Sequence, residues 1–473
     1  MVEASHLTTV YPMPVRFHIE DAALAATLRQ VETVVRKAGG RLWLVGGCLR
    51  DLALGQQPRD LDLEIHGIPP GRVHRLLTEH FTVQFVGKAF GVFKLAGLPI
   101  DIALPTRRLT AEATIPSLLQ YADPHMDIDD ALARRDFTIN AMAWDPDTLE
   151  LRDPFNGRDD LAHRRLRHVS ERFGEDPLRV LRGMQLAARY DLSASPDTAA
   201  LCRTLSQEGL PSERLWDEWK KLLLKGVRPS MGLRWLEQCG WLRFYPELAA
   251  LQGCPQDPLW HPEGDVWVHT LHCLDAFAQE RTGQPDDDLT VGLGVLCHDF
   301  GKPATTEEAF GRITSRGHEP EGETPARTFL SRLTNQSGLA DDVAALVRCH
   351  LRPRQLYDAK ASDSAVRRLA TQVGRIDRLV RVARADHLGR PPKPDDGFPA
   401  GTWLLEKARA LAVDRKAPPP IVMGRHLLEL GMHPGPAMGQ LLDMCYEAQL
   451  DGVFSTLEEG IQYARRIGVQ AST

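Results

Sequence analysis

The chain has 473 residues, of which 43% are hydrophobic and 25% charged, and its formal net charge is −6. This composition is ordinary for a globular protein, so it excludes wholesale disorder and collagen-like order, and the length suggests about three domains. No apolar run approaches the roughly 18 residues that a membrane span needs, and the N-terminus lacks the basic start and apolar core of a secretory signal. The net charge argues against indiscriminate nucleic-acid binding but is compatible with a local basic groove.

The eight cysteines are spread along the chain without a close-spaced pair. Such cysteines are typical of reduced core residues in an intracellular protein. We therefore expect a cytoplasmic protein that has no membrane partner. The sequence makes no prediction about the oligomeric state.

The order of the predicted elements divides the chain into a strand-rich first part and a helical remainder, which begins at about residue 157. Strands are predicted at 41–45, 60–65, 81–87, 92–96 and 99–104. The predicted parts are a lead-in helix at 1–40, an α/β head at 41–156, a helical neck and body at 157–252, a helical domain at 265–390 and a C-terminal helical piece at 402–473. Segments rich in Pro and Gly, at 253–265 and 390–401, are expected to be linkers.

An acidic pair marks the second predicted strand. Asp60 and Asp62 lie two residues apart, so both carboxylates project from one face of the strand. Adjacent carboxylates repel unless a cation lies between them, and oxygen ligands suit Mg²⁺. Asp101, flanked by aliphatic residues on a neighbouring strand, is a candidate third acidic group. The alternative is a solvated strand edge after a glycine turn.

A glycine pair precedes this strand. Gly46 and Gly47 allow backbone N–H groups to approach an anion closely, at the start of a short helix that carries Arg50. Amides at a helix start can hold the β- and γ-phosphates of a nucleotide.

Two later segments carry charged groups at suggestive spacings. The first contains Arg134, Arg135, Asp136 and Asn140. Its arginines are either solubilising charge or a clamp for a triphosphate, with Asp136 accepting from a ribose hydroxyl. The second contains Glu175, Asp176, Arg179 and Arg182, which form one stripe along a helix. The alternative for this stripe is an exposed face with (i, i+4) salt bridges.

In this order and spacing, segments 44–65, 133–145, 152–169 and 174–190 resemble the motifs of class II tRNA nucleotidyltransferases, the family of CCA-adding enzymes and bacterial poly(A) polymerases. The resemblance covers about residues 40–250. It implies an α+β chain: a polymerase-β-like α/β nucleotidyltransferase head followed by an all-α neck and body. It further implies partners, namely tRNA, CTP and ATP.

The resemblance also implies roles for the residues named above. Asp60 and Asp62 would bind two Mg²⁺ ions while the tRNA 3′-hydroxyl attacks the α-phosphate of CTP or ATP. The positions of Arg134, Arg135 and Asp136 would handle phosphate and ribose. Those of Glu175, Asp176 and Arg179 would form a protein template that hydrogen-bonds the Watson–Crick edge of C or A. Such a site discriminates strongly, because a wrong base leaves buried polar groups unpaired.

One segment departs from the family pattern. Relatives carry a glycine-containing loop that helps the switch from C to A addition, whereas residues 106–133 contain no glycine. Leu109, Ile115, Leu118 and Leu119 can even pack as a helix. A CC-adding enzyme that leaves the last A to a partner is therefore an alternative, as is an A-adding enzyme.

A second set of metal-ligating residues is spread over the helical part. It consists of His269, His298, Asp299, His318, His350 and Asp386. Imidazoles and carboxylates on several helices can converge on a divalent cation, and a buried Asp needs such a partner. The series resembles the HD phosphohydrolase superfamily over about residues 265–390. That resemblance implies an all-α HD domain and a divalent metal of unspecified identity. The chain is also similar to bacterial CCA-adding enzymes that carry this domain, which implies hydrolysis of 2′,3′-cyclic phosphates and 2′-nucleotides.

Three rival functions fit parts of the pattern. A bacterial poly(A) polymerase has very similar head motifs, but the acidic net charge and the HD domain argue against it. A phosphohydrolase with a nucleotide-sensing head does not need Asp60 and Asp62 intact. A tRNA-binding protein without chemistry requires both metal sites to be idle.

Overall fold

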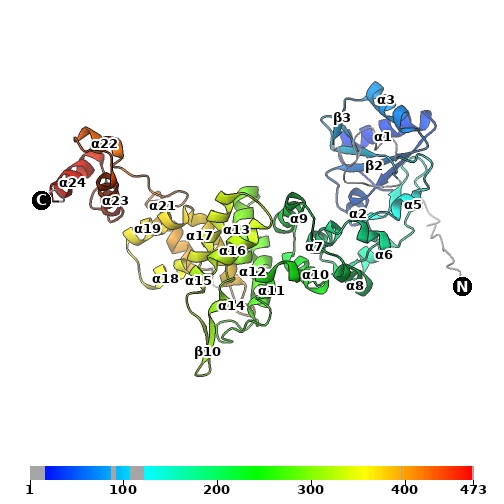
Figure 1. Cartoon of the computed structure of the whole chain (residues 1–473). Coiled ribbons are helices and arrows are strands. Elements are labelled where there is room, and N and C mark those ends of the chain that lie inside the picture. The colour runs from blue at the N-terminus through cyan, green and yellow to red at the C-terminus, as the bar shows by residue number, and fades with distance from the viewer. Residues whose placement is uncertain (1–15, 87–91, 107–121, 396, 471–473) are drawn as a thin grey trace. The chain divides into compact units, whose positions relative to one another are not determined.

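The computed structural model describes residues 16–86, 92–106, 122–395 and 397–470. The chain divides into two compact units: residues 1–210 with 235–241, and residues 211–234 with 242–473 (Figure 1). The predicted helix involving Leu109 and Leu119 lies outside the described residues. Within the described ranges, every helix is too short or too polar to pass through a membrane.

The first unit is built on a seven-stranded sheet of order β3-β4-β5-β2-β1-β6-β7. Its strands are β1 (Arg41–Val45), β2 (Leu61–His66), β3 (Val83–Val86), β4 (Val92–Leu95), β5 (Ile100–Ala103), β6 (Ala143–Trp144) and β7 (Leu151–Arg152). Strands β2 and β5 pair in parallel, and the other neighbours pair antiparallel. This parallel pair at the centre of the sheet places Asp62 opposite Asp101.

The burial pattern of β2 agrees with the alternation from which the acidic pair was predicted. Leu61, Leu63 and Ile65 are buried, as the two-residue period predicts. The strand begins at Leu61, one residue later than predicted, so Asp60 lies just before it and is exposed.

Helices cover and extend the sheet. They are α1 (Ala22–Lys37), α2 (Gly47–Ala53), α3 (Pro70–His80), α5 (Ile128–Leu132), α6 (Gly157–Ala162), α7 (Leu178–Tyr190) and α8 (Pro196–Thr204). The Asp21 side chain caps α1 by accepting from two backbone amides, and α1 buries an apolar stripe that includes Leu28 and Val31. The predicted lead-in helix is thus present among the described residues.

The helical part of this unit packs around aromatic rings. Phe137 contacts Phe173 and Trp235 edge-on, at centroid distances of 5.2 and 5.7 Å. The Trp235 indole donates a hydrogen bond to the Val180 carbonyl, 2.8 Å away, and lies against Gly183 of α7. Only a glycine fits there, because a Cβ on Gly183 would lie 2.3 Å from the Trp235 ring.

We therefore expect Gly183→Ala to lower the free energy of unfolding by about 1–3 kcal/mol, the usual cost of overpacking a core. Urea-induced unfolding measures this change. Gly71→Ala is the matched control: Gly71 also lies in a helix, and a Cβ there meets nothing within 4 Å. The control should be neutral or slightly stabilising. Equal stability of the two variants would contradict this packing.

The second unit is mostly helical. Its helices before the C-terminal piece are α9 (Ser212–Lys225), α11 (Pro246–Ala249), α12 (Val266–Gln279), α13 (Pro285–Cys297), α14 (Lys302–Thr305), α15 (His318–Glu321), α16 (Glu323–Ser331), α17 (Ser337–Cys349), α18 (Arg352–Asp358), α19 (Asp363–Val373), α20 (Ile376–Leu388) and α21 (Pro399–Ala410). The division between the units falls within α10 (Pro229–Gln238).

Two glycines of α13 allow its neighbours to approach closely. A Cβ on Gly292 would lie 2.8 Å from the Phe277 ring of α12, and one on Gly294 would lie 2.9 Å from Val382 of α20. The end of α13, where His298 and Asp299 follow, is thereby held between α12 and α20.

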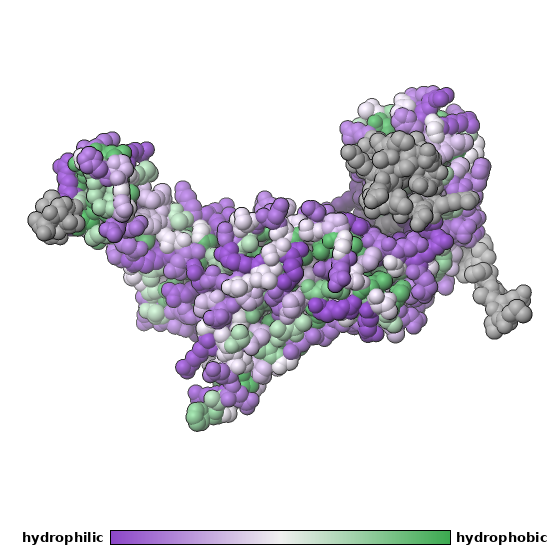
Figure 2. Space-filling view, viewed as in Figure 1, coloured by the Kyte–Doolittle hydropathy of each residue, from purple (hydrophilic) through white to green (hydrophobic). Residues whose placement is uncertain are grey.

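A hairpin of β10 (Thr306–Ala309) and β11 (Arg312–Ser315) interrupts the helices. Its turn carries Phe310 at φ 53° and Gly311 at φ 70°. Phe310 is fully exposed, which gives the hairpin an apolar tip (Figure 2).

The chain ends in α22 (Gly424–Glu429), α23 (Pro436–Leu450) and α24 (Leu457–Gln470). These helices share a core of their own that includes Val422, Leu441, Cys445 and Phe454. The observed classes of structure confirm the predicted α+β chain, with a mixed-sheet head and helical remainder.

Candidate active sites

The acidic group of the head is centred on Asp62. Burial raises the pKa of Asp62, and nearby Asp60 and Asp101 add to the rise against the attraction of Arg135. Lys94 forms an ion pair with Asp101 at 2.8 Å. Three carboxylates therefore share a small region in which Arg135 and Lys94 offset only part of the negative charge. Such an arrangement fits a divalent cation with oxygen ligands.

The backbone of Gly46 and Gly47 lies against this acidic group. Gly46 has φ 74°, and a Cβ there would lie 2.9 Å from Arg135 Nη1 and 3.1 Å from Asp62 Oδ2. The position therefore requires glycine for both its conformation and its neighbours. The Gly47 amide donates to the Asp62 carboxylate. Phosphate binding by these amides stays a prediction.

Arg135 is held in place by a residue that the sequence reasoning missed. Its Nη2 donates to Glu64 Oε2 at 3.2 Å, and the same buried carboxylate contacts His66 Nε2 at 2.8 Å. Glu64 lies two residues after Asp62 on β2 and therefore on the same face. The alternation that identified Asp60 and Asp62 extends to Glu64 and was the available signal.

The predicted nucleotide residue Arg50 is buried among protein partners. Its guanidinium donates to Asn140 Oδ1 at 2.7 Å and to the Tyr190 hydroxyl at 2.6 Å, and it also pairs with Asp51. Asn140 in turn donates to Asp136 at 3.0 Å. Arg50 and Asn140 thus connect α2 to α7 in this structure, and their contact with a nucleotide stays a prediction.

A cavity of about 910 Å³ is lined by two arginines, Arg134 and Arg172, and by four acidic residues, Asp123, Asp127, Asp130 and Glu171. Burial and the neighbouring Arg172 and Arg179 lower the pKa of Arg134, which lines this cavity. Arg179 donates to the carbonyl oxygens of Arg172 and Arg134, both at 2.8 Å. The arginines are therefore close enough together to contact one anionic group, although carboxylates also line the cavity. The prediction of one helical stripe is wrong for Glu175 and Asp176, because α7 begins only at Leu178: Glu175 ends a short 3-10 helix and Asp176 is extended. Asp176 accepts from the Leu178 amide at 3.2 Å.

The second site is a buried histidine cluster in the other unit. In each ring Nδ1 faces an oxygen: Val295 O for His298, Ser315 O for His318 and Val347 O for His350, each at 2.7 Å. His269 Nδ1 faces both the Glu263 carboxylate at 2.7 Å and Gly389 O at 3.1 Å. For His298, His318 and His350 these contacts assign the proton to Nδ1 and leave the lone pair on Nε2, whereas His269 faces a carboxylate at each nitrogen.

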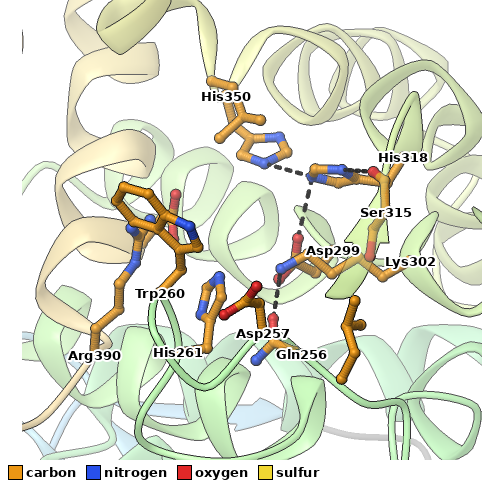
Figure 3. Close-up of a pocket in the computed structure, with 13 residues that line it drawn as sticks. Gln256, Asp257, Trp260, His261, Asp299, Lys302, Ser315, His318, His350 and Arg390 are labelled. Carbon is orange, nitrogen blue, oxygen red and sulfur yellow. Dashed lines mark hydrogen bonds and ion pairs between the residues drawn. The ribbon is translucent and has the colours of Figure 1, made fainter. Parts of the chain in front are cut away.

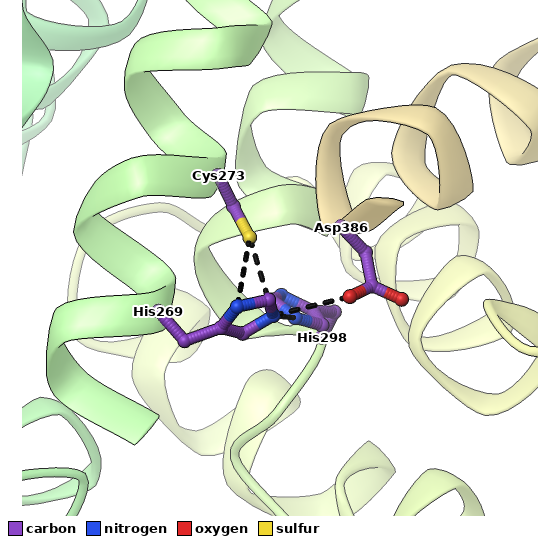
Figure 4. Close-up of side chains that lie close together, drawn as sticks. All are labelled: His269, Cys273, His298 and Asp386. Atoms are coloured by element: carbon purple, nitrogen blue, oxygen red, sulfur yellow. Dashed lines mark hydrogen bonds and ion pairs between the residues drawn. The ribbon is translucent and has the colours of Figure 1, made fainter. Parts of the chain in front are cut away.

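The four Nε2 atoms then converge. His269 Nε2 lies 3.4 Å from His298 Nε2 and 3.1 Å from Asp386 Oδ1 (Figure 4). His318 Nε2 lies 3.3 Å from His350 Nε2 and 3.5 Å from Asp299 Oδ1 (Figure 3). Facing lone pairs repel unless a cation lies between them. The structure therefore brings together all six residues predicted for this site, in two groups.

Asp299 lies between the two groups. Both of its oxygens are buried and have no hydrogen-bond partner within the described part of the chain, although Lys302 Nζ forms an ion pair with Oδ2 at 2.8 Å. Burial and the neighbouring His298 and His318 lower the pKa of His350 to about 3, so this ring is neutral, the form that binds metal. At His269, by contrast, burial alone would lower the pKa, but Cys273, Asp386 and Glu263 raise it well above its usual value. A set of imidazoles and carboxylates that meet in this way fits divalent metal.

Comparison with known proteins distinguishes the candidate families that the sequence left open. Residues 42–167 match the family of the Poly A polymerase head domain, and residues 266–390 match the HD domain. The Multifunctional CCA protein of Laribacter hongkongensis (strain HLHK9) is 38% identical over 373 residues, which cover 76% of this chain and 87% of that protein. The chain belongs to the family of multifunctional CCA proteins. Its predicted membership of the tRNA nucleotidyltransferases with an HD domain is confirmed.

Solved structures of CCA-adding enzymes share the fold of this member of the multifunctional CCA protein family. The Bacillus stearothermophilus CCA-adding enzyme in complex with CTP aligns with a TM-score of 0.64 at 20% identity, over 94% of this chain and 97% of that one. The Thermotoga maritima CCA-adding enzyme complexed with tRNA aligns with a TM-score of 0.55 at 19% identity, over 94% and 96%.

The segment predicted as a linker before the HD domain is part of the histidine site. Gln256, Asp257, Trp260 and His261 line the cavity at the histidine cluster, and Glu263 of the same segment contacts His269. Pro and Gly in this segment suggested a spacer, but they shape a loop that faces the site. The neighbouring His-Pro-Glu sequence was the available signal. Cys273, one turn after His269, also lies in the cluster, with Sγ 3.3 Å from His269 Nε2.

The contribution of Asp136 to the free energy of unfolding should depend on pH. Burial alone would raise its pKa, but Arg182, Asn140 and the Phe137 amide lower it to about 2. A carboxylate with a lowered folded-state pKa stabilises the fold above its unfolded pKa, and this contribution is lost as pH falls through the folded value. Asp136→Asn should therefore lower the unfolding free energy by about 2 kcal/mol at neutral pH.

The difference between wild type and Asp136→Asn should stay constant from about pH 8 to pH 5 and shrink below about pH 4. Urea-induced unfolding at several pH values measures it. The exposed Asp147→Asn is the control and should change little. A difference that grows on acidification would show that Asp136 is not held as a carboxylate.

Proposed function

We propose that this protein adds C and then A to the 3′ end of tRNA from CTP and ATP, and so completes the CCA terminus. The observation that carries the proposal is the register of Asp62 with Asp101 on adjacent parallel strands, inside a head that matches the family. Two Mg²⁺ ions bound by Asp60 and Asp62 would supply stabilisation of the attacking and leaving oxygens. Asp101, paired to Lys94, adds the third carboxylate.

The arginines supply the groups that a triphosphate needs. Arg134 and Arg179 lie in a crowded basic group next to an open cavity, and Arg135 stands over Gly46 and Asp62. Arginine binds phosphate oxygens with a rigid fork of donors. We assign phosphate contacts to Arg134 and Arg135. Asp136, which also pairs with Arg182 and accepts from Asn140, is assigned to accept from a ribose hydroxyl.

Base selection is assigned to Glu175, Asp176 and Arg179. An Asp acceptor beside an Arg donor matches the edge of C or A, whereas U and G present the wrong groups. The test is incorporation of each nucleoside triphosphate alone into tRNA transcripts ending at the discriminator base, at C and at CC. Selective use of CTP on the first two and of ATP on the third is expected. Use of UTP or GTP at similar rates would contradict this assignment.

A second activity is proposed for the HD domain, on the evidence of the converging Nε2 atoms and the unsatisfied Asp299. Divalent metal held there would activate water for attack on phosphorus. His269, His298 and Asp386 would hold one position, and Asp299, His318 and His350 the other. The substrates are 2′,3′-cyclic phosphates and 2′-phosphates. Phosphate release from adenosine 2′-phosphate with Mg²⁺, Mn²⁺ or Ni²⁺ tests the activity and identifies the metal.

The cellular setting is also part of the proposal. All eight cysteines are buried free thiols, as expected for a protein from a reducing compartment. We place the protein in the cytoplasm. The division into lead-in, head, neck and body, HD domain and C-terminal piece stays a prediction.

A further inference from the structure

An exposed tryptophan stands at the mouth of the HD site. Trp260 is 61% exposed, although it lies beside a cavity of about 300 Å³ that contains Asp299, His318 and His350. It also borders a second cavity of about 340 Å³. Both cavities share Trp260, His350, Leu351, Asp386 and Arg390 as lining residues. In Figure 3 the indole rises from its loop next to His261 and Arg390.

The loop that carries Trp260 is fixed at three points. Lys302 Nζ donates to Gln256 Oε1 at 2.6 Å, Lys393 Nζ donates to the Trp260 carbonyl at 2.9 Å, and His261 Nδ1 contacts Glu263 at 2.8 Å. The Lys393 ammonium also lies 5.4 Å from the centroid of the Trp260 ring. The backbone that carries the exposed ring is therefore tethered beside the site, which favours a preorganised binding platform.

The surroundings specify the chemistry of a ligand. The cluster of imidazoles and carboxylates suits metal-bound phosphate. Lys302 and Arg390, which pair with Asp299 and Asp386, place cationic groups at the same cavity. An exposed indole next to a phosphate site suits a flat aromatic ring, because every nucleobase has a π-face that stacks on aromatic side chains. A nucleotide carries both groups on one molecule.

We propose that Trp260 is the platform on which the base of the HD-site substrate stacks, so that this site selects nucleotides over phosphate esters without a base. The inference rests on the proposed hydrolysis and adds to it a specificity-determining residue. Because purines offer the larger π-surface, the platform favours adenosine over uridine substrates.

The test compares phosphate release from adenosine 2′-phosphate and from glycerol 2-phosphate, which lacks a base, by the full-length protein with Mn²⁺. Trp260→Ala should raise KM for adenosine 2′-phosphate about tenfold and leave kcat/KM for glycerol 2-phosphate unchanged. Trp260→Phe should restore most of the loss, and the preference for adenosine over uridine 2′-phosphate should disappear only in Trp260→Ala.

Leu259→Ala is the matched control, since Leu259 is 73% exposed in the same loop and lines neither cavity. It should behave as wild type. Equal effects of Trp260→Ala on both substrates, no effect on either, or a changed oligomeric state with unchanged KM would overturn the proposal. If wild type releases phosphate from neither substrate, the proposed hydrolysis fails; calorimetric titration with adenosine 2′-phosphate then decides, and equal affinity of wild type and Trp260→Ala would refute stacking.

Discussion

An Asp62→Asn variant should lose at least about 10³-fold of its rate of nucleotide addition, because metal stabilisation of the transferring phosphoryl group is worth several kcal/mol. Burial raises the pKa of Asp62, and its register with Asp101 places two acids on adjacent strands. Asparagine keeps the shape of the side chain and removes the charge that a divalent cation requires. The measurement is the single-turnover rate of CTP incorporation into a tRNA transcript.

Two controls accompany this variant. Asp147→Asn removes a half-exposed carboxylate of the same unit and should add nucleotides at the wild-type rate. Phosphate release by the HD domain should be unchanged in Asp62→Asn, since the residues of that site belong to the other unit. Wild-type incorporation by Asp62→Asn would remove this carboxylate from the catalytic group.

An Asp299→Asn variant should lose phosphate release and keep nucleotide addition. Asp299 contacts both histidine groups, so loss of its charge should weaken Mn²⁺ binding at least about 10²-fold and abolish phosphate release. Nucleotide addition should continue at the wild-type rate. Metal content after dialysis, measured by atomic emission, gives a readout that does not depend on turnover.

Asp299→Asn also removes the ion-pair partner of the buried Lys302, which can destabilise the domain. A second variant, His318→Gln, keeps this pair and removes one imidazole. It should likewise lose metal and phosphate release, while its thermal unfolding in the presence of a chelator stays near that of wild type under the same condition. Wild-type metal content in His318→Gln would place the metal elsewhere.

Periodic patterns in the sequence predicted the head well. The β1 strand was predicted with its observed bounds, and the alternation around Asp62 correctly separated buried Leu61 and Leu63 from the acidic face. These features depend on neighbours along the chain, whose spacing a sequence displays directly. The six residues of the histidine cluster were also identified, because His and Asp in apolar helices are unusual.

Contacts between distant segments were not predictable in the same way. Arg50 was expected at a nucleotide, yet its guanidinium is directed at Tyr190, 140 positions later. The loop with Trp260 and Glu263 was expected to be a linker, because its Pro and Gly content is the same whether a loop spans solvent or lines a site. Such partners become visible only when the fold brings them together.

The most direct test of the central claim is the sequence of the product made from a tRNA transcript that ends at its discriminator base, incubated with CTP, ATP and Mg²⁺. We expect growth by C, C and A and then a stop, even though residues 106–133 contain no glycine. A stop after CC would assign the last step to another protein, and a long ladder of A would indicate a poly(A) polymerase. Absence of any extension would contradict the assignment of Asp60, Asp62 and Asp101 to nucleotide transfer.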